Sequence, residues 1–218
     1  MSKAPTTVLG GALLRPAYWQ DACEHLTKSD RVMNKLIPQF PDASLQSRGD
    51  AFTTLARSVV GQQISVKAAQ SVWNRFEALL PNVAPAQVLR LKVDDMRSAG
   101  LSARKVEYLV DLSLHFDSGL LHVDAWQGMD DEAIIKELVA IRGIGRWTAE
   151  MFLIFYLLRP NVLPLDDVGL INGISKSYFS GEPVSRSEAR EVAAAWAPYC
   201  SVATWYIWRS LDPVPVAY

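Results

Sequence analysis

Apolar side chains recur every three or four positions along most of this chain, which is the spacing of one face of an α-helix. One repeat runs from Phe52 to Val60, and the next runs from Val66 to Leu80. Further repeats, several of them preceded by a Ser or Asp that can cap a helix, cover residues 102–114, 130–139, 146–159, from about 166, 187–196 and 201–211. No segment shows the alternation of a strand, so we predict an all-α fold.

Three stretches without a helical repeat separate these runs, and we predict them to be linkers: residues 38–49, 80–85 and 116–130. We expect two helical lobes. Residues 50–160 would form a central lobe, and residues 1–49 would combine with residues 161–218 in a second lobe. A cleft between two such lobes is a usual place for a binding site.

Half of the 218 residues are apolar, which is typical of a folded chain rather than a disordered one. The most apolar segment, residues 147–158, is shorter than the roughly 20 residues of a membrane span, so we predict a buried helix there and no membrane partner. The N-terminus lacks the pattern of a secretory signal, so we expect a protein that is not secreted: cytoplasmic or at the nucleoid in a bacterium, nuclear in a eukaryote.

The two cysteines, Cys23 and Cys200, are too few for a disulfide framework or a four-thiolate iron–sulfur site, and we expect reduced thiols. The formal net charge is −1, so composition shows no broad basic footprint for nucleic acid. Any contact with DNA would therefore have to be local.

The most informative segment runs from Leu138 to Ala149, where one helical run ends and another begins around Gly143 and Gly145. Glycine permits left-handed backbone angles and a close approach by another group. The N-terminus of the second helix offers backbone N–H groups and a favourable dipole to an anion, and Arg142 and Arg146 add local positive charge. The pattern fits either a plain helical turn with a glycine cap or a phosphate site that needs no broad basic surface.

Two adjacent carboxylates, Asp166 and Asp167, follow Pro164 at the start of another predicted helix. On pattern alone, Asp166 would be the N-cap and Asp167 would occupy the first helical position, where both favour the helix dipole.

The glycine hairpin, the Asp pair after it and the Gln62–Gln63 turn before it together resemble the helix-hairpin-helix DNA glycosylase superfamily, specifically its alkylation-repair (3-methyladenine DNA glycosylase II) branch. The resemblance covers about residues 50–210. It implies a two-lobed helix-hairpin-helix DNA glycosylase fold with a cleft between the lobes. It also implies an enzyme that hydrolyses the N-glycosidic bond of flipped-out alkylated bases, such as 3-methyladenine and 7-methylguanine, and leaves an abasic site in base excision repair.

Within the resemblance, Asp167 takes the catalytic role and Asp166 is left as the cap. An ionised carboxylate beside the sugar stabilises the positive charge that develops as the base leaves, and it can orient the attacking water. Trp147 stands where the strand-cutting members of the superfamily carry a Lys nucleophile. Tryptophan cannot form a Schiff base, so the resemblance implies a monofunctional hydrolase.

Residue matching implies a base pocket of Trp147 and Trp208, with Met151 and Val168 where some bacterial relatives have Tyr. Aromatic rings suit this role because a flipped, electron-poor base stacks well on them. For the side chain that intercalates where the base left the stack, the matching favours Gln63 and keeps Gln62 as an alternative. DNA phosphates would meet the hairpin at these residues: Gly143, Gly145, Arg146 and Thr148. Lys105 would either approach a phosphate or lie on a solvated face.

We expect no cofactor. Relatives bind a monovalent cation through hairpin carbonyls, which implies Na⁺ or K⁺ at the backbone of Val139, Ile141 and Ile144. The partner implied is double-stranded DNA that contains damaged bases, and we expect a monomer. Three alternatives stay open: a non-catalytic helix-hairpin-helix DNA-binding module, a glycosylase for another class of lesion, and a helical scaffold that binds no nucleic acid. The sequence does not rank the lesions.

Overall fold

The computed structural model describes residues 15–41, 44–47 and 49–212, and within these ranges it contains helices and no β-strand. The all-α prediction is confirmed for this part of the chain. The α-helices are α1 (Trp19–Ser29), α2 (Arg31–Leu36), α3 (Ala51–Gly61), α4 (Val66–Glu77), α5 (Pro85–Val88), α6 (Val93–Ser98), α7 (Ala103–Asp117), α8 (Asp131–Val139), α9 (Arg146–Phe155), α10 (Val168–Tyr178), α11 (Arg186–Ala193) and α12 (Cys200–Leu211). Short 3₁₀ helices are η1 (Ile37–Gln39), η2 (Val123–Gly128) and η3 (Ala194–Trp196).

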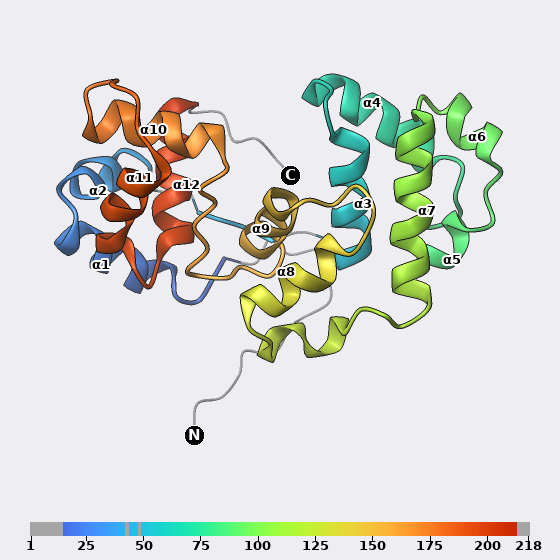
Figure 1. Ribbon diagram of the computed structural model, residues 1–218, viewed down its shortest axis with the longest axis horizontal. Helices are drawn as coiled ribbons and strands as arrows, with labels where there is room; N and C mark the ends of the chain where they lie inside the picture. Colours follow the sequence, from blue (N-terminus) through green and yellow to red (C-terminus); the bar gives the residue numbers. More distant parts are fainter. Residues whose placement is uncertain (1–14, 42–43, 48, 213–218) are drawn as a thin grey trace.

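The helices form two groups that are joined through the middle of the molecule (Figure 1). Helices α1, α2, α10, α11 and α12 lie together on one side, α3 to α7 lie on the other, and α8 and α9 lie between them. The first and last parts of the described chain thus share one group. The division at residues 50 and 160 stays a prediction.

Buried aromatic rings join α1 to α12. Trp19 meets Trp205 edge-on, with ring centroids 5.2 Å apart, and lies 5.7 Å from Tyr206. The carboxylate of Asp30 adds polar contacts: one oxygen caps α2, and the other accepts the Tyr178 hydroxyl at 2.9 Å and the Trp196 indole N–H at 3.2 Å. A buried carboxylate with four donors satisfies its lone pairs, so it ties the N-terminal helices to the C-terminal ones without an unpaired charge.

Helices α10 and α12 cross closely at Gly173. A Cβ atom at this position would lie 2.2 Å from Cγ2 of Ile207, so only glycine allows the two helices to approach as they do. This crossing fixes α10 against α12, and each of these helices contributes one residue to the site described below.

Helix α9 lies at the centre of the fold, and its residues from Thr148 to Ile154 are all buried. This confirms the buried helix that the apolar segment predicts, although the helix ends at Phe155 rather than beyond it. Cys23 and Cys200 are both free, and burial raises the pKa of the Cys200 thiol to about 11. No helix of the described residues combines the length and the apolar character needed to cross a membrane.

Candidate active site

The hairpin between α8 and α9 contains two glycines that the fold uses differently. Gly143 has φ of +83°, and a Cβ atom there would lie 2.2 Å from the ring of Tyr108 on α7. Gly145, the N-cap of α9, has φ of −91°, which any residue can adopt, and a Cβ atom there would meet nothing within 4 Å. The fold therefore requires a glycine at 143, whereas the space beside residue 145 is open.

That open space lies at the start of a helix whose cap supplies no side-chain oxygen. The first turn of any α-helix presents N–H groups that have no acceptor inside the helix, together with the positive end of the helix dipole. A phosphate oxygen is a suitable acceptor for such groups. The hairpin has the local geometry of an anion site, and phosphate contacts at Gly143, Gly145 and Thr148 stay a prediction.

Arg146, the first residue of α9, is held by two carboxylates. Its terminal nitrogens pair with Glu132 on α8, and its Nε donates to Glu150 at 3.0 Å. These ion pairs raise the pKa of the guanidinium further. The side chain braces the two hairpin helices with three of its five N–H groups, and a phosphate contact by Arg146 stays a prediction.

Lys105 has a hydrogen-bond partner within the protein. Its ammonium group donates to the carbonyl oxygen of Val60 at 2.7 Å, and burial lowers its pKa. The side chain therefore satisfies a carbonyl at the C-terminal end of α3, where a positive charge also complements the helix dipole. One of its three N–H groups is used in this way, and the side chain is partly exposed, so a contact between Lys105 and a phosphate stays a prediction.

Asp167 is the N-cap of α10, and three N–H groups hold its carboxylate. Oδ1 accepts the backbone amide of Leu170 at 2.6 Å and the indole N–H of Trp208 at 2.8 Å. Oδ2 accepts the indole N–H of Trp147 at 2.9 Å. Trp147 precedes Asp167 by 20 residues and Trp208 follows it by 41, so the fold brings together three of the predicted site residues from separate helices.

The prediction that Asp166 caps this helix is wrong. The backbone N–H of Asp167 closes a turn onto the carbonyl of Pro164 at 2.9 Å, so the helix begins one residue later than the pattern indicates. Asp166 instead forms an exposed ion pair with Arg186 at 2.6 Å. One side chain, Asp167, thus serves both as the cap and as the acceptor of the two tryptophans.

Two further residues, which were not predicted from the sequence, shape the surroundings of Asp167. Phe155 stacks on the ring of Trp208, with centroids 5.7 Å apart and planes 12° from parallel. A Cβ atom at Gly169 would lie 3.1 Å from Oδ1 of Asp167 and 3.4 Å from Trp208. The absent side chain at residue 169 lets the indole approach the carboxylate, and a glycine two residues after a capping Asp was the available signal.

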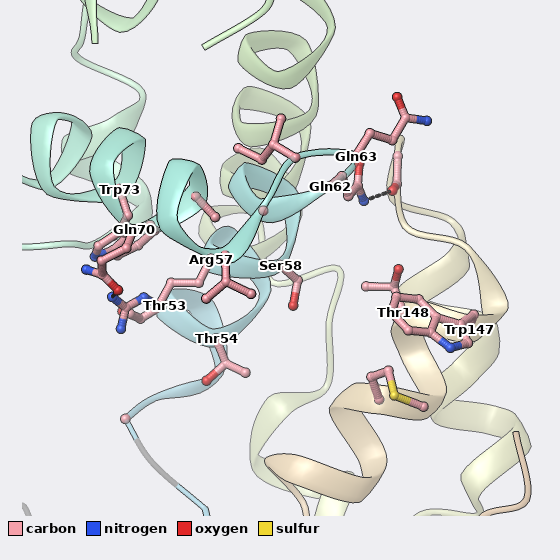
Figure 2. A pocket seen from close by; sticks show the side chains of 17 residues that line it. Thr53, Thr54, Arg57, Ser58, Gln62, Gln63, Gln70, Trp73, Trp147 and Thr148 are labelled. Carbon is pink, nitrogen blue, oxygen red and sulfur yellow. Dashed lines mark hydrogen bonds between the residues drawn. The ribbon is translucent and has the colours of Figure 1, made fainter. Parts of the chain in front are cut away.

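A cleft of about 880 Å³ lies between the α3–α4 pair and the start of α9 (Figure 2). Trp147, Thr148 and Met151 line it on the α9 side. The opposite wall contains the predicted Gln62 and Gln63, and its other residues were not predicted. They include the apolar Ile64, Val66, Ala69 and Trp73 and the polar Thr53, Thr54, Arg57, Ser58 and Gln70. Trp147 therefore belongs to two surroundings, because it lines the cleft and also binds Asp167.

The remaining base-pocket residues lie outside this lining. Trp208 contacts Asp167 and Phe155 instead, and Val168 is 71% exposed at the start of α10. The structure thus places Trp147 and Met151 on the cleft, Trp208 beside the carboxylate, and Val168 on the surface next to it.

The two glutamines of the α3–α4 turn point in different directions (Figure 2). The Nε2 of Gln62 donates to the carbonyl oxygen of Gly143 in the hairpin, at 2.8 Å. Gln63 has a left-handed φ of +60°, and its side chain is exposed. No cluster of three or more His, Cys, Asp or Glu side chains suited to a metal ion occurs among the described residues.

Comparison with known proteins finds one family and several close structural relatives. Residues 56–198 match the family described as HhH-GPD superfamily base excision DNA repair protein. DNA-3-methyladenine glycosylase 1 of Schizosaccharomyces pombe is 32% identical over 194 residues, which cover 85% of each chain.

Two solved structures are also similar. A DNA-3-methyladenine glycosidase from Bacillus halodurans has a TM-score of 0.82 and 32% identity, and the match covers 93% of both chains. The 3-methyladenine DNA glycosylase Mag1 of S. pombe, solved in complex with abasic DNA, has a TM-score of 0.74 and 28% identity over 90% of this chain and 100% of the other.

Proposed function

The chain belongs to the HhH-GPD superfamily of base excision DNA repair proteins, and from this membership we propose that it is a DNA glycosylase for alkylated bases. It hydrolyses the N-glycosidic bond of bases such as 3-methyladenine and 7-methylguanine in double-stranded DNA. The observation that carries the proposal is the carboxylate of Asp167, which two tryptophans from different helices hold beside a cleft.

The geometry suggests how the reaction proceeds. As the bond between C1′ and the base nitrogen breaks, its electron pair leaves with the base and positive charge develops on the sugar. A carboxylate already oriented by N–H donors stabilises that charge without having to reorganise. Water then adds its hydroxyl to C1′, its proton is lost, and an abasic site remains.

The two oxygens of Asp167 have different tasks. An ionised carboxylate offers about four lone-pair positions. Oδ1 uses two of its own, for Leu170 and Trp208, whereas Oδ2 accepts one hydrogen bond among the contacts of the described residues, from Trp147. We assign Oδ2 as the oxygen that faces the sugar or the attacking water.

Trp147 supports the choice of substrate and of reaction. It lines the cleft together with Met151, and an indole stacks favourably on the cationic ring of an alkylated purine. Because an indole cannot form a Schiff base, the enzyme releases an intact abasic strand. Borohydride treatment during turnover should therefore trap no covalent adduct between protein and DNA.

The substitution Asp167→Asn tests the assignment, and Asp166→Asn is the matched control. An amide removes the negative charge, and if its NH₂ group replaces Oδ2 it also faces the Trp147 donor. We expect single-turnover release of 7-methylguanine from a methylated duplex, read as alkali-cleaved abasic sites, to fall by about 10² to 10³, or roughly 3–4 kcal/mol of barrier. Binding to the duplex should persist, and Asp166→Asn should excise as the wild type does. Near-normal excision by Asp167→Asn would remove Asp167 from the mechanism.

Two further predictions belong to this proposal: the chain acts as a monomer, and the hairpin holds Na⁺ or K⁺ through backbone carbonyls of Val139, Ile141 and Ile144. The carbonyl of Ile141 accepts the amide of Ile144 at 3.1 Å, which uses one of its two lone pairs and leaves the other for an ion. Replacing K⁺ and Na⁺ by tetramethylammonium at constant ionic strength should weaken DNA binding if the ion is present.

A further inference from the structure

A hydrogen bond joins the α3–α4 turn to the hairpin. Gln62 follows the last residue of α3, and its Nε2 donates to the carbonyl oxygen of Gly143 across 81 residues of sequence (Figure 2). The bond is 2.8 Å long and half-buried. It connects two elements that each carry a predicted DNA contact.

Helix α7 contacts the same two elements from the other side. Lys105 donates to the carbonyl of Val60 near the end of α3, at 2.7 Å. One turn later, the ring of Tyr108 packs against Gly143, and Asp111 accepts the backbone amide of Arg142 at 2.8 Å. Residues three apart share one face of a helix, so this face of α7 holds both the end of α3 and the hairpin.

Gly143 is consequently held from two directions. Tyr108 occupies the space into which a side chain would project, and Gln62 binds its carbonyl oxygen. The bond from Gln62 closes a loop of contacts that runs from α3 through α7 to the hairpin and back. Neither the turn nor the hairpin can shift without breaking a hydrogen bond or a packing contact in this loop.

Gln63 lies directly beyond this fixed point. Its φ of +60° is costly for a residue with a side chain, by about 1–2 kcal/mol, and such conformations persist where neighbouring contacts enforce them. The conformation turns the Gln63 side chain away from the one that binds the hairpin and leaves it exposed (Figure 2).

We propose that Gln62 is a positioning residue and not the residue that enters the base stack. It sets the distance and direction between the hairpin, which binds the DNA backbone, and Gln63, which fills the gap left by the flipped base. This inference rests on the proposed function, and it assigns different tasks to two adjacent residues of the same type.

A double-mutant cycle tests it. Gln62→Met keeps the length of the side chain and removes the donor, and Gln63→Ala removes the intercalating group. Gln39→Met is the matched control, because Gln39 also donates to a backbone carbonyl, that of Lys35 at 2.9 Å, but in η1 and outside the cleft. Two readouts are measured: single-turnover excision of 7-methylguanine, and fluorescence of 2-aminopurine beside a tetrahydrofuran abasic analogue, which reports insertion without any bond cleavage.

Gln62→Met should lower excision and the insertion equilibrium by about threefold to tenfold, the factor that corresponds to one net hydrogen bond. In the Gln63→Ala background the same substitution should change both readouts by less than about twofold, because a positioning residue acts only through its neighbour. Gln39→Met should match the wild type. The unfolding temperature of Gln62→Met should fall by about 1–6 °C.

An equal loss in both backgrounds would show that Gln62 itself acts on the DNA and would overturn the proposal, as would wild-type behaviour of Gln62→Met. If Gln62→Met does not fold, Gln62→Glu, which replaces the donor by an acceptor, provides the same cycle. If the wild type excises no alkylated base, the proposed function fails, and the fluorescence measurement still decides the role of Gln62.

Discussion

Replacing Gly145 by serine should separate DNA binding from stability. The backbone of residue 145, with φ of −91° and ψ of 171°, is in the extended region that N-cap residues adopt, and no atom lies within 4 Å of its would-be Cβ. Serine is a preferred N-cap, so α9 should keep its stability or gain a few tenths of a kcal/mol.

The same side chain should weaken DNA binding. The serine hydroxyl accepts an N–H group of the first helical turn, and its methylene fills the open space in which a phosphate would lie. Losing one hydrogen bond to a charged group costs about 1.5–3 kcal/mol, which corresponds to roughly tenfold to 100-fold in affinity. Fluorescence-polarisation titration of a labelled duplex at fixed salt measures this loss, and thermal unfolding measures stability.

Gly143→Ala is the contrasting variant. An L-residue at φ of +83° costs about 1–2 kcal/mol, and the overlap with Tyr108 adds about 1–3 kcal/mol. For a chain of this size the unfolding temperature should fall by roughly 4–20 °C. A Gly145→Ser variant that binds DNA as tightly as the wild type would refute the phosphate site at this cap, and a Gly143→Ala variant with wild-type stability would refute the packing argument.

Three other outcomes are expected. Trp208→Phe keeps an aromatic ring and removes one donor to Asp167, so single-turnover excision should fall about tenfold while the unfolding temperature stays within a few degrees of the wild type. Burial raises the pKa of Glu150, and the ion pair with Arg146 opposes that rise, so Arg146→Ala should lower the free energy of unfolding at pH 7.5. The difference in stability from the wild type should shrink as the pH falls, because Glu150 then becomes protonated in both proteins. A stability difference that does not change with pH would contradict this. Gly173→Ala should lower the free energy of unfolding by about 1–3 kcal/mol in thermal melts, because α10 and α12 would have to separate, and an unchanged melt would show that the crossing yields.

Helices α1 and α2 were not predicted, but the long helices from α3 onward were, because their buried apolar residues either form one stripe or, as in α9 and α12, continue around the helix. Helix α3 buries Phe52, Leu55 and Val59 as the repeat requires, and α9 is buried along most of its length. Helices α5 and α6 were not predicted either. A helix of four to six residues contains little more than one turn, so it shows no repeat that can be distinguished from chance.

Local backbone chemistry was also visible in the sequence. A pair of glycines between two helical repeats indicated the hairpin, and an Asp before a helix indicated a cap. Which Asp caps α10 was not visible, because the choice depends on the turn that Asp167 closes onto Pro164.

The sequence by itself determined most of the helices and the hairpin, because these depend on interactions between near neighbours in the chain. The residues assigned to the chemistry came from the resemblance to a family, and their roles stay predictions. The tertiary structure alone decided where the side chains point. It placed Trp147 and Trp208 on the two oxygens of Asp167, engaged Arg146 with carboxylates, and gave Gln62 and Gln63 different surroundings. Each of these outcomes depends on a contact between residues that lie at least one helical turn apart in the chain. Where two adjacent side chains are chemically similar, the spacing of residue types along the sequence does not show which of them makes the contact.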